Sequence, residues 1–109
     1  MTATLMAPLV AHAGWFSPDI PNLGVQRQAL CVLNEMRAAT SEDDVEYISR
    51  SCAAYRKDET PATAFIVPAT YESGLDCTQA MVHQLPLVPG NGHEDSEQVT
   101  AACFTLYER

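Results

Sequence analysis

The sequence predicts a small all-α domain of four helices, arranged as two hairpins that are held by two disulfide bonds. Apolar residues recur every three to four positions in four segments, and each of these segments contains one cysteine. The chain has 109 residues, enough for one hydrophobic core and too few for two. Hydrophobic residues make up 47% of the chain and charged residues 18%, as in folded globular domains.

Residues 1–13 have the pattern of a secretory signal peptide. Most of them are apolar, and Ala11-His12-Ala13 has the small-x-small form that signal peptidase cleaves. The basic residues that usually open such a segment are missing, because the first one in the chain is Arg27. The alternative is a retained apolar arm that packs on a partner or on the chain's own core. We expect cleavage after Ala13, which leaves one mature domain over residues 14–109.

Two amphipathic helices are expected in the first half of the mature chain. The first follows Asn22, a capping residue, and runs over residues 23–39. The second begins after Ser41, whose hydroxyl can accept the backbone N–H of Asp44 at the helix start. The second helix has a buried stripe and two basic residues at its negative end, namely Val45, Ile48, Cys52 and Tyr55, then Arg56 and Lys57.

The second half of the chain is expected to begin with an extended crossover. Residues 61–70 contain two prolines around Phe65-Ile66-Val67, which disfavours a long helix. The crossover either covers the core with these three side chains or pairs as a short strand at 64–67.

Two more helices are expected after the crossover. The third helix runs over residues 73–84 and ends before Pro86. Pro-Gly and Asn-Gly turns then lead to the last helix, which Asp95 or Ser96 caps. The apolar stripes of these two helices are Leu75, Cys77, Ala80, Met81 and Leu85, and Val99, Ala102, Cys103 and Leu106.

The four cysteines predict two disulfide bonds. None of them belongs to a C-x-x-C motif, and an even number of well-spaced cysteines in a short exported chain is typical of a disulfide framework. In an antiparallel helix hairpin, residues equally distant from the turn face each other. This condition favours Cys31–Cys52 and Cys77–Cys103 over the other two connectivities. Four free thiols buried in a cytosolic protein are the alternative.

The charge balance and the distribution of apolar residues each argue against one class of protein. The chain has 6 Lys and Arg against 14 Asp and Glu, a net charge of −8, whereas a general nucleic-acid binder needs a basic face. It contains no run of 18 apolar residues, so we expect no transmembrane span.

Carboxylates gather at the predicted starts of the second and fourth helices. These helices run parallel in an up-down-up-down arrangement, so both groups are expected at one end of the domain, where they would steer a basic protein partner. A simpler explanation is that the acids complement the helix dipoles and keep the protein soluble. The candidate partner-binding acids are Glu42, Asp43, Asp44, Glu46, Glu94, Asp95 and Glu97.

Trp15 and Phe16 open the mature chain if cleavage falls after Ala13. They either plug one end of the core or form an exposed contact site, and we include both among the candidate partner-binding residues. Only 7% of the residues are aromatic, which favours the core role.

No catalytic motif is present. The chain lacks G-x-S-x-G, H-E-x-x-H, a P-loop and G-x-G-x-x-G, so we expect no enzyme activity, no catalytic residue, no metal and no cofactor. The expected function is a non-enzymatic periplasmic or secreted binding protein, such as an inhibitor or immunity-type protein, that docks its acidic surface on a basic enzyme.

Two other functions are the alternatives. One is an accessory subunit of a larger assembly in an oxidising compartment, such as the mitochondrial intermembrane space or the cell envelope. The other is a carrier of a small apolar ligand, with Met36, Met81 and Phe65 lining a cavity between the helix pairs.

Overall fold

The computed structural model describes residues 20–67, 70–86, 88 and 94–108. This part of the chain folds into four α-helices, which are α2 (Leu23–Glu35), α3 (Glu42–Ala53), α4 (Gly74–Val82) and α5 (Glu94–Tyr107). Two 3-10 turns, η2 (Met36–Ala38) and η3 (Ala54–Lys57), extend α2 and α3. The all-α prediction is confirmed. The described residues form no strand, so the alternative of a strand at 64–67 is wrong.

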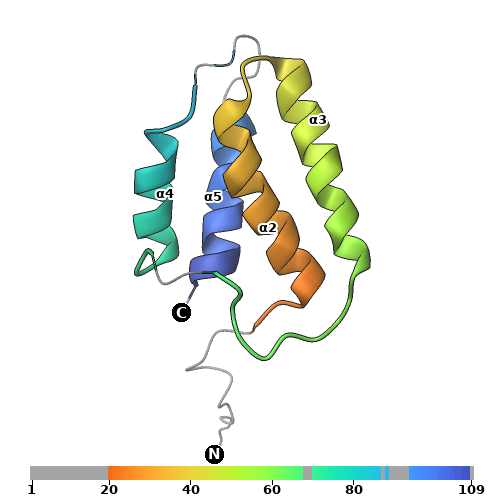
Figure 1. Cartoon of the computed structure of the whole chain (residues 1–109). Coiled ribbons are helices and arrows are strands. Elements are labelled where there is room, and N and C mark those ends of the chain that lie inside the picture. The colour runs from red at the N-terminus through yellow and green to blue at the C-terminus, as the bar shows by residue number, and fades with distance from the viewer. Residues whose placement is uncertain (1–19, 68–69, 87, 89–93, 109) are drawn as a thin grey trace, which may run out of the picture.

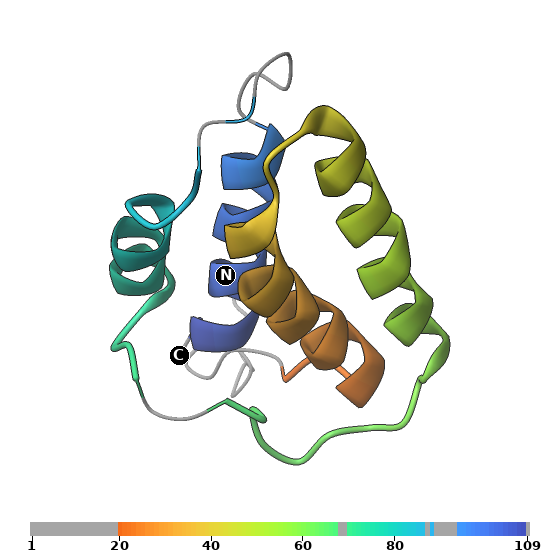
Figure 2. The same ribbon diagram turned by 45° about the horizontal axis from the view of Figure 1, so that its top comes forward.

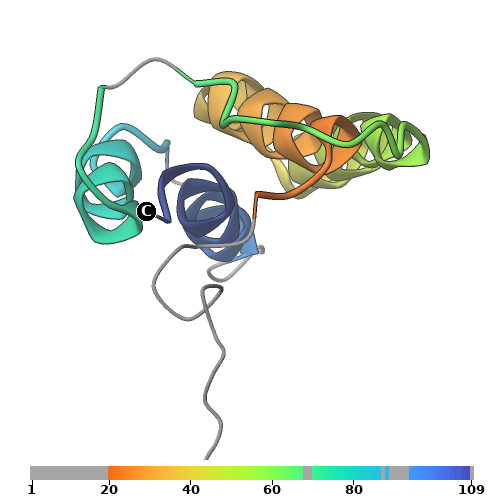
Figure 3. The ribbon, with the colours of Figure 1, turned by 90° about the horizontal axis from the view of Figure 1, so that it is seen from below.

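The four helices run alternately up and down, as Figure 1 shows. Seen from below, they lie side by side in the order α3, α2, α5, α4, with α2 and α5 at the centre (Figure 3). The chain between α3 and α4 crosses the lower end of the molecule (Figure 1). Consecutive helices are therefore antiparallel neighbours within each pair.

Both predicted disulfide bonds are present. Cys31–Cys52 joins α2 to α3, and Cys77–Cys103 joins α4 to α5, with Cα–Cα distances of 5.5 and 5.6 Å. Each bond links the two helices of one antiparallel hairpin. The equal-distance argument from the sequence therefore selected the right connectivity.

Two helices begin at the capping residues that the sequence predicts, Asn22 and Ser41, and a third begins at a cap that was not predicted, Ser73. The Asn22 side-chain oxygen accepts the N–H of Val25 at 2.9 Å at the start of α2. The Ser41 hydroxyl accepts the N–H of Asp44 at 3.1 Å at the start of α3. Ser73 caps α4 in the same way, three residues before Asp76. These bonds satisfy N–H groups that have no partner within the helix.

The start of α5 differs from the prediction. The helix begins at Glu94, so Asp95 and Ser96 lie inside its first turn and neither is the cap. The Asp95 carboxylate accepts the N–H of the next residue, Ser96, at 2.9 Å, and Asp95 is only 6% exposed. Asp95 thus turns inward instead of capping the helix from outside.

The core lies between α2 and α5 and extends to the inner faces of α3 and α4. Two residues assigned to buried stripes are exposed instead, because Tyr55 is 47% exposed and Leu75 is 57% exposed. Tyr55 belongs to η3, where three residues per turn rotate it away from the α3 stripe. Leu75 belongs to α4, which packs mainly against α5 and lies at the edge of the row of helices. The fully buried core side chains include Met36, Val45, Cys52, Cys77, Val99, Cys103 and Leu106.

A buried glutamine, which sequence reasoning missed, holds the crossover against α2. The Gln26 side-chain nitrogen donates to the carbonyls of Pro21 at 2.9 Å and Ala64 at 3.2 Å. Its oxygen accepts the N–H of Ile66 at 2.6 Å. The backbone at 64–66 thus bonds to a side chain instead of a neighbouring strand. The signal for Gln26 was its spacing, three residues before Ala29 on the apolar stripe.

Replacing Gln26 by leucine is expected to lower the free energy of unfolding by about 2 kcal/mol, because the Ala64 and Ile66 backbone groups lose their partner. Denaturant unfolding measures this loss, and faster hydrogen exchange at the Ile66 N–H locates it. The control is Gln79→Leu on the exposed side of α4. Equal stability of both variants would show that Gln26 does not anchor the crossover.

Candidate functional site

The starts of α3 and α5 lie at the same end of the molecule, the upper end in Figure 1. Figure 2 brings this end forward and shows the last turn of α2 near the two helix starts. The acids predicted from the sequence therefore come together from two separate segments. The carbonyl end of α2 adds further partial negative charge to the same surface. We call this surface, formed by Glu42, Asp43, Asp44, Glu46, Glu94, Asp95 and Glu97, the acidic end.

Asp44 has a structural role within the acidic end. Its Oδ2 accepts the Thr40 backbone N–H at 3.0 Å and the Thr40 hydroxyl at 3.1 Å. The Thr40 backbone bond, followed by the Thr40 hydroxyl, lowers the pKa of Asp44 below its ordinary value of 3.8. The Asp44 carboxylate thus accepts from the turn before α3, while the Ser41 hydroxyl of that turn accepts the Asp44 backbone N–H, and together these bonds fix where the helix starts.

We expect Asp44→Asn to destabilise the protein at neutral pH, and we expect this difference to disappear in acid. The pKa of Asp44 is lower in the folded chain, so the carboxylate stabilises the fold above about pH 4, the unfolded value. That contribution is lost as the pH falls through the folded pKa. Denaturant unfolding of both proteins at neutral and acid pH measures the difference.

The neighbouring Asp43→Asn is the control, since Asp43 is exposed and lies in the same helical turn. Its difference from the unmodified protein should be small at both pH values. An Asp44→Asn difference that persists unchanged in acid would contradict the assignment.

Four acids of the acidic end are exposed, namely Glu42, Asp43, Glu94 and Glu97, and the Glu94 carboxylate also accepts the side-chain N–H of Gln98 at 3.3 Å. Glu46 is also exposed, but its carboxylate lies 3.5 Å from Arg50 one turn later on α3. Asp95 is only 6% exposed, so it adds negative charge to the acidic end but offers little surface for contact with a partner. The surface available for contact is thus narrower than the seven acids suggested by the sequence.

Several basic residues lie at the opposite end. Arg27 stands near the start of α2, 3.7 Å from Asp58, while Arg56 and Lys57 are exposed in η3. The start of α2 and the end of η3 are both at the lower end in Figure 1. These three basic residues therefore lie away from the acidic end, beside acids such as Asp58 and Glu59. At the acidic end, Arg37 donates to the Gln84 side chain at 3.4 Å and so leans toward α4.

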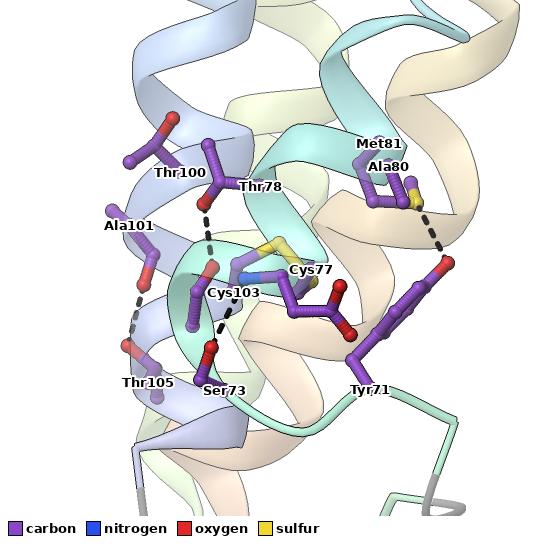
Figure 4. The surroundings of a disulfide bond; sticks show 12 residues. Tyr71, Ser73, Cys77, Thr78, Ala80, Met81, Thr100, Ala101, Cys103 and Thr105 are labelled. Carbon is purple, nitrogen blue, oxygen red and sulfur yellow. Dashed lines mark hydrogen bonds between the residues drawn. A yellow bond between two sulfur atoms is a disulfide. The ribbon is translucent and has the colours of Figure 1, made fainter.

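The cysteines serve as cross-links, since all four are disulfide-bonded. Figure 4 shows the surroundings of Cys77–Cys103, where the Tyr71 hydroxyl donates to the Met81 sulfur at 3.8 Å. Tyr71 also packs edge-on against Tyr107, with ring centres 5.2 Å apart. These aromatic rings cover the lower part of the α4–α5 pair.

The hollows in the described surface are small. Two of them have cavity volumes of about 230 and 200 Å³, compared with about 300–1,000 Å³ for typical small-molecule sites. A third, of about 390 Å³, opens broadly to solvent beside Cys31 and Tyr55. Of the side chains expected to line a ligand cavity, Met36 is fully buried in the core, Met81 is 5% exposed at the second hollow, and Phe65 is half-buried in the crossover.

Within residues 20–67, 70–86, 88 and 94–108, no three His, Cys, Asp or Glu side chains gather as a metal site. None of the helices in this part of the chain has the length and apolarity needed to cross a bilayer. Trp15, Phe16 and the expected cleavage site lie outside the described residues. The two disulfide bonds are compatible with an oxidising compartment.

By its fold and its cross-links, the protein is a small, acidic, all-α domain with two disulfide-bonded helix hairpins. Comparison of the chain with protein-family models, with curated proteins and with solved structures finds no match.

Proposed function

We propose that this protein is a non-enzymatic exported binding protein, of inhibitor or immunity type, that docks its acidic end on a basic enzyme. The observation that supports this proposal is the convergence of Glu42 and Asp43 from α3 with Glu94 and Glu97 from α5 at one end. Two helix starts far apart in sequence thus present exposed charge of one sign to one side of the molecule.

Export into the periplasm or the extracellular space is part of the proposal. It is supported by the two disulfide bonds and by the cleavage pattern Ala11-His12-Ala13. Lysozymes, amidases and nucleases that are exported into the cell envelope or attack it are often basic, which makes them suitable partners for an acidic surface.

Exposed charges of this kind act mainly on the rate of association. Complementary surface charge raises association rate constants from about 10⁵–10⁶ to 10⁸ M⁻¹s⁻¹ or more at low salt. Salt screens the attraction over about 10 Å at 0.1 M ionic strength. The proposal therefore predicts binding whose association slows strongly with salt while dissociation changes little.

The test measures binding to, and inhibition of, a panel of purified basic exported enzymes: a lysozyme, an amidase and a nuclease. The triple variant Glu42→Gln, Glu94→Gln and Glu97→Gln is expected to associate about tenfold more slowly at low salt with any enzyme that the unmodified protein binds. Kinetic binding measurements at low and high salt record both rate constants.

A charge-matched control separates the acidic end from net charge. Glu59, Glu72 and Glu108 are exposed outside the acidic end, and their replacement by glutamine also removes three negative charges. This control should associate at nearly the unmodified rate. Equal slowing of both triple variants, or no binding to any enzyme in the panel at low salt, would count against the proposal.

A further inference from the structure

A groove lies between α2, α5 and η3, on a side of α2 that no described helix covers. Its volume is about 230 Å³, and it is open to solvent. Its floor is apolar, since Ala29, Val32 and Ala102 are 6, 5 and 4% exposed. The complete lining is Val25, Gln28, Ala29, Val32, Arg56, Gln98, Ala101, Ala102 and Thr105.

The size and lining of the groove suit a single aromatic side chain. A volume of about 230 Å³ is below the range of about 300–1,000 Å³ for small-molecule sites. Apart from Gln98, the α5 wall is built from small residues, and the Thr105 hydroxyl is already bonded to the Ala101 carbonyl at 2.9 Å. Arg56, at the edge, supplies a cation that can lie over an aromatic face.

We propose that Trp15 of the same chain occupies this groove. The described chain begins at Ile20, and its first residues lie beside the lower end of α5 in Figure 3. The groove starts close by, at Val25 in the first turn of α2 and Thr105 in the last turn of α5. Trp15 lies five positions before Ile20, and an extended chain of that length spans up to about 17 Å.

The apolar surface also requires a cover from within reach. None of the residues that line the groove is aromatic, so the lining itself supplies no ring to fill this space. An indole offers a large apolar surface for burial and a face that attracts a guanidinium. Trp15 thereby seals the open side of α2 and α5 and is not available as a contact for another protein.

The chain contains one tryptophan, so indole fluorescence of the full-length protein reports on Trp15 alone. The docked indole is expected to emit at shorter wavelength than free tryptophan and to resist quenching by acrylamide, and unfolding should abolish both properties. The proposal would be overturned if the folded protein had the same emission maximum and the same quenching constant as free tryptophan.

A paired substitution tests the location of the indole. Ala101 is exposed on the groove wall, so Ala101→Arg should leave the fold intact, as circular dichroism can verify, but should displace Trp15 and shift its emission to longer wavelength. Ala38→Arg is the control, since Ala38 is exposed in η2 at the other end of α2. Unchanged emission in a folded Ala101→Arg protein would place the indole elsewhere and reject this groove.

A second measurement does not depend on the Ala101→Arg variant folding. Trp15→Leu removes the ring current of the indole, which is expected to move the methyl NMR signals of Val25, Ala101 and Ala102. The methyl signals of Val45 and Ile48, on the α2-facing side of α3, should remain in place. Methyl signals at the groove that do not respond to Trp15→Leu would also refute the assignment.

Discussion

Replacing Cys77 and Cys103 together by alanine is expected to release α4 from the domain. α4 has nine residues, whereas isolated helices shorter than about 12–15 residues are marginal in water. It depends on its contacts with α5 and on the Cys77–Cys103 bond that holds them together. Without that bond, α4 must lose much of its helical structure when it leaves α5.

The effect should exceed that of removing the other disulfide. The two bonds close loops of 21 and 26 residues, for which the chain-entropy contribution is about 3 kcal/mol in both cases. The packing around the cysteines decides which of the two losses of stability is larger. Cys77 and Cys103 are both 0% exposed, so their truncation also leaves empty space in the core, while Cys31 is only partly buried.

Denaturant unfolding of the double variants Cys77→Ala/Cys103→Ala and Cys31→Ala/Cys52→Ala measures the two losses. We expect a loss of at least about 3 kcal/mol for the first and a smaller loss for the second. Hydrogen exchange should show the first loss concentrated in α4. A greater loss for Cys31→Ala/Cys52→Ala would show that packing around Cys77–Cys103 is not the deciding difference.

Replacing Gly24 by alanine is expected to cost about 3 kcal/mol, the upper part of the usual range for overpacking. A Cβ at this position would collide with the backbone carbonyl oxygens of Tyr55 and Asp58. These oxygens cannot rotate away as side chains do. The Gly24 N–H also donates to the Asp58 carbonyl at 3.0 Å, so separating the two backbones breaks a hydrogen bond at the start of α2.

Gly74→Ala is the matched control at the first turn of another helix. Its Cβ would meet the ring of Phe104, a side chain that is 40% exposed and has room to turn. The higher helix propensity of alanine, worth about 1 kcal/mol, offsets this contact. Thermal or denaturant unfolding should show a large loss for Gly24→Ala and a change within about 1 kcal/mol for Gly74→Ala. Similar losses for both would refute the backbone argument.

Local patterns in the chain were sufficient to predict the helices and their cross-links. Capping at Asn22 and Ser41 depends on contacts three residues away, and the cysteine pairing depends on distance from a turn. Such features involve near neighbours in sequence, so they can be recognised before any packing is known. The same local chemistry placed acids at the starts of α3 and α5.

Other features depend on contacts between distant segments, and no local pattern contains them. Gln26 bonds to residues 38 and 40 positions away, and these bonds stand in place of the strand pairing that was the alternative for the crossover. Leu75 is exposed because α4 lies at the edge of the row of helices. Asp95 is buried, whereas its neighbour Glu94 is exposed. Long-range packing decides which face of a helix is covered, and therefore which acids a partner can reach.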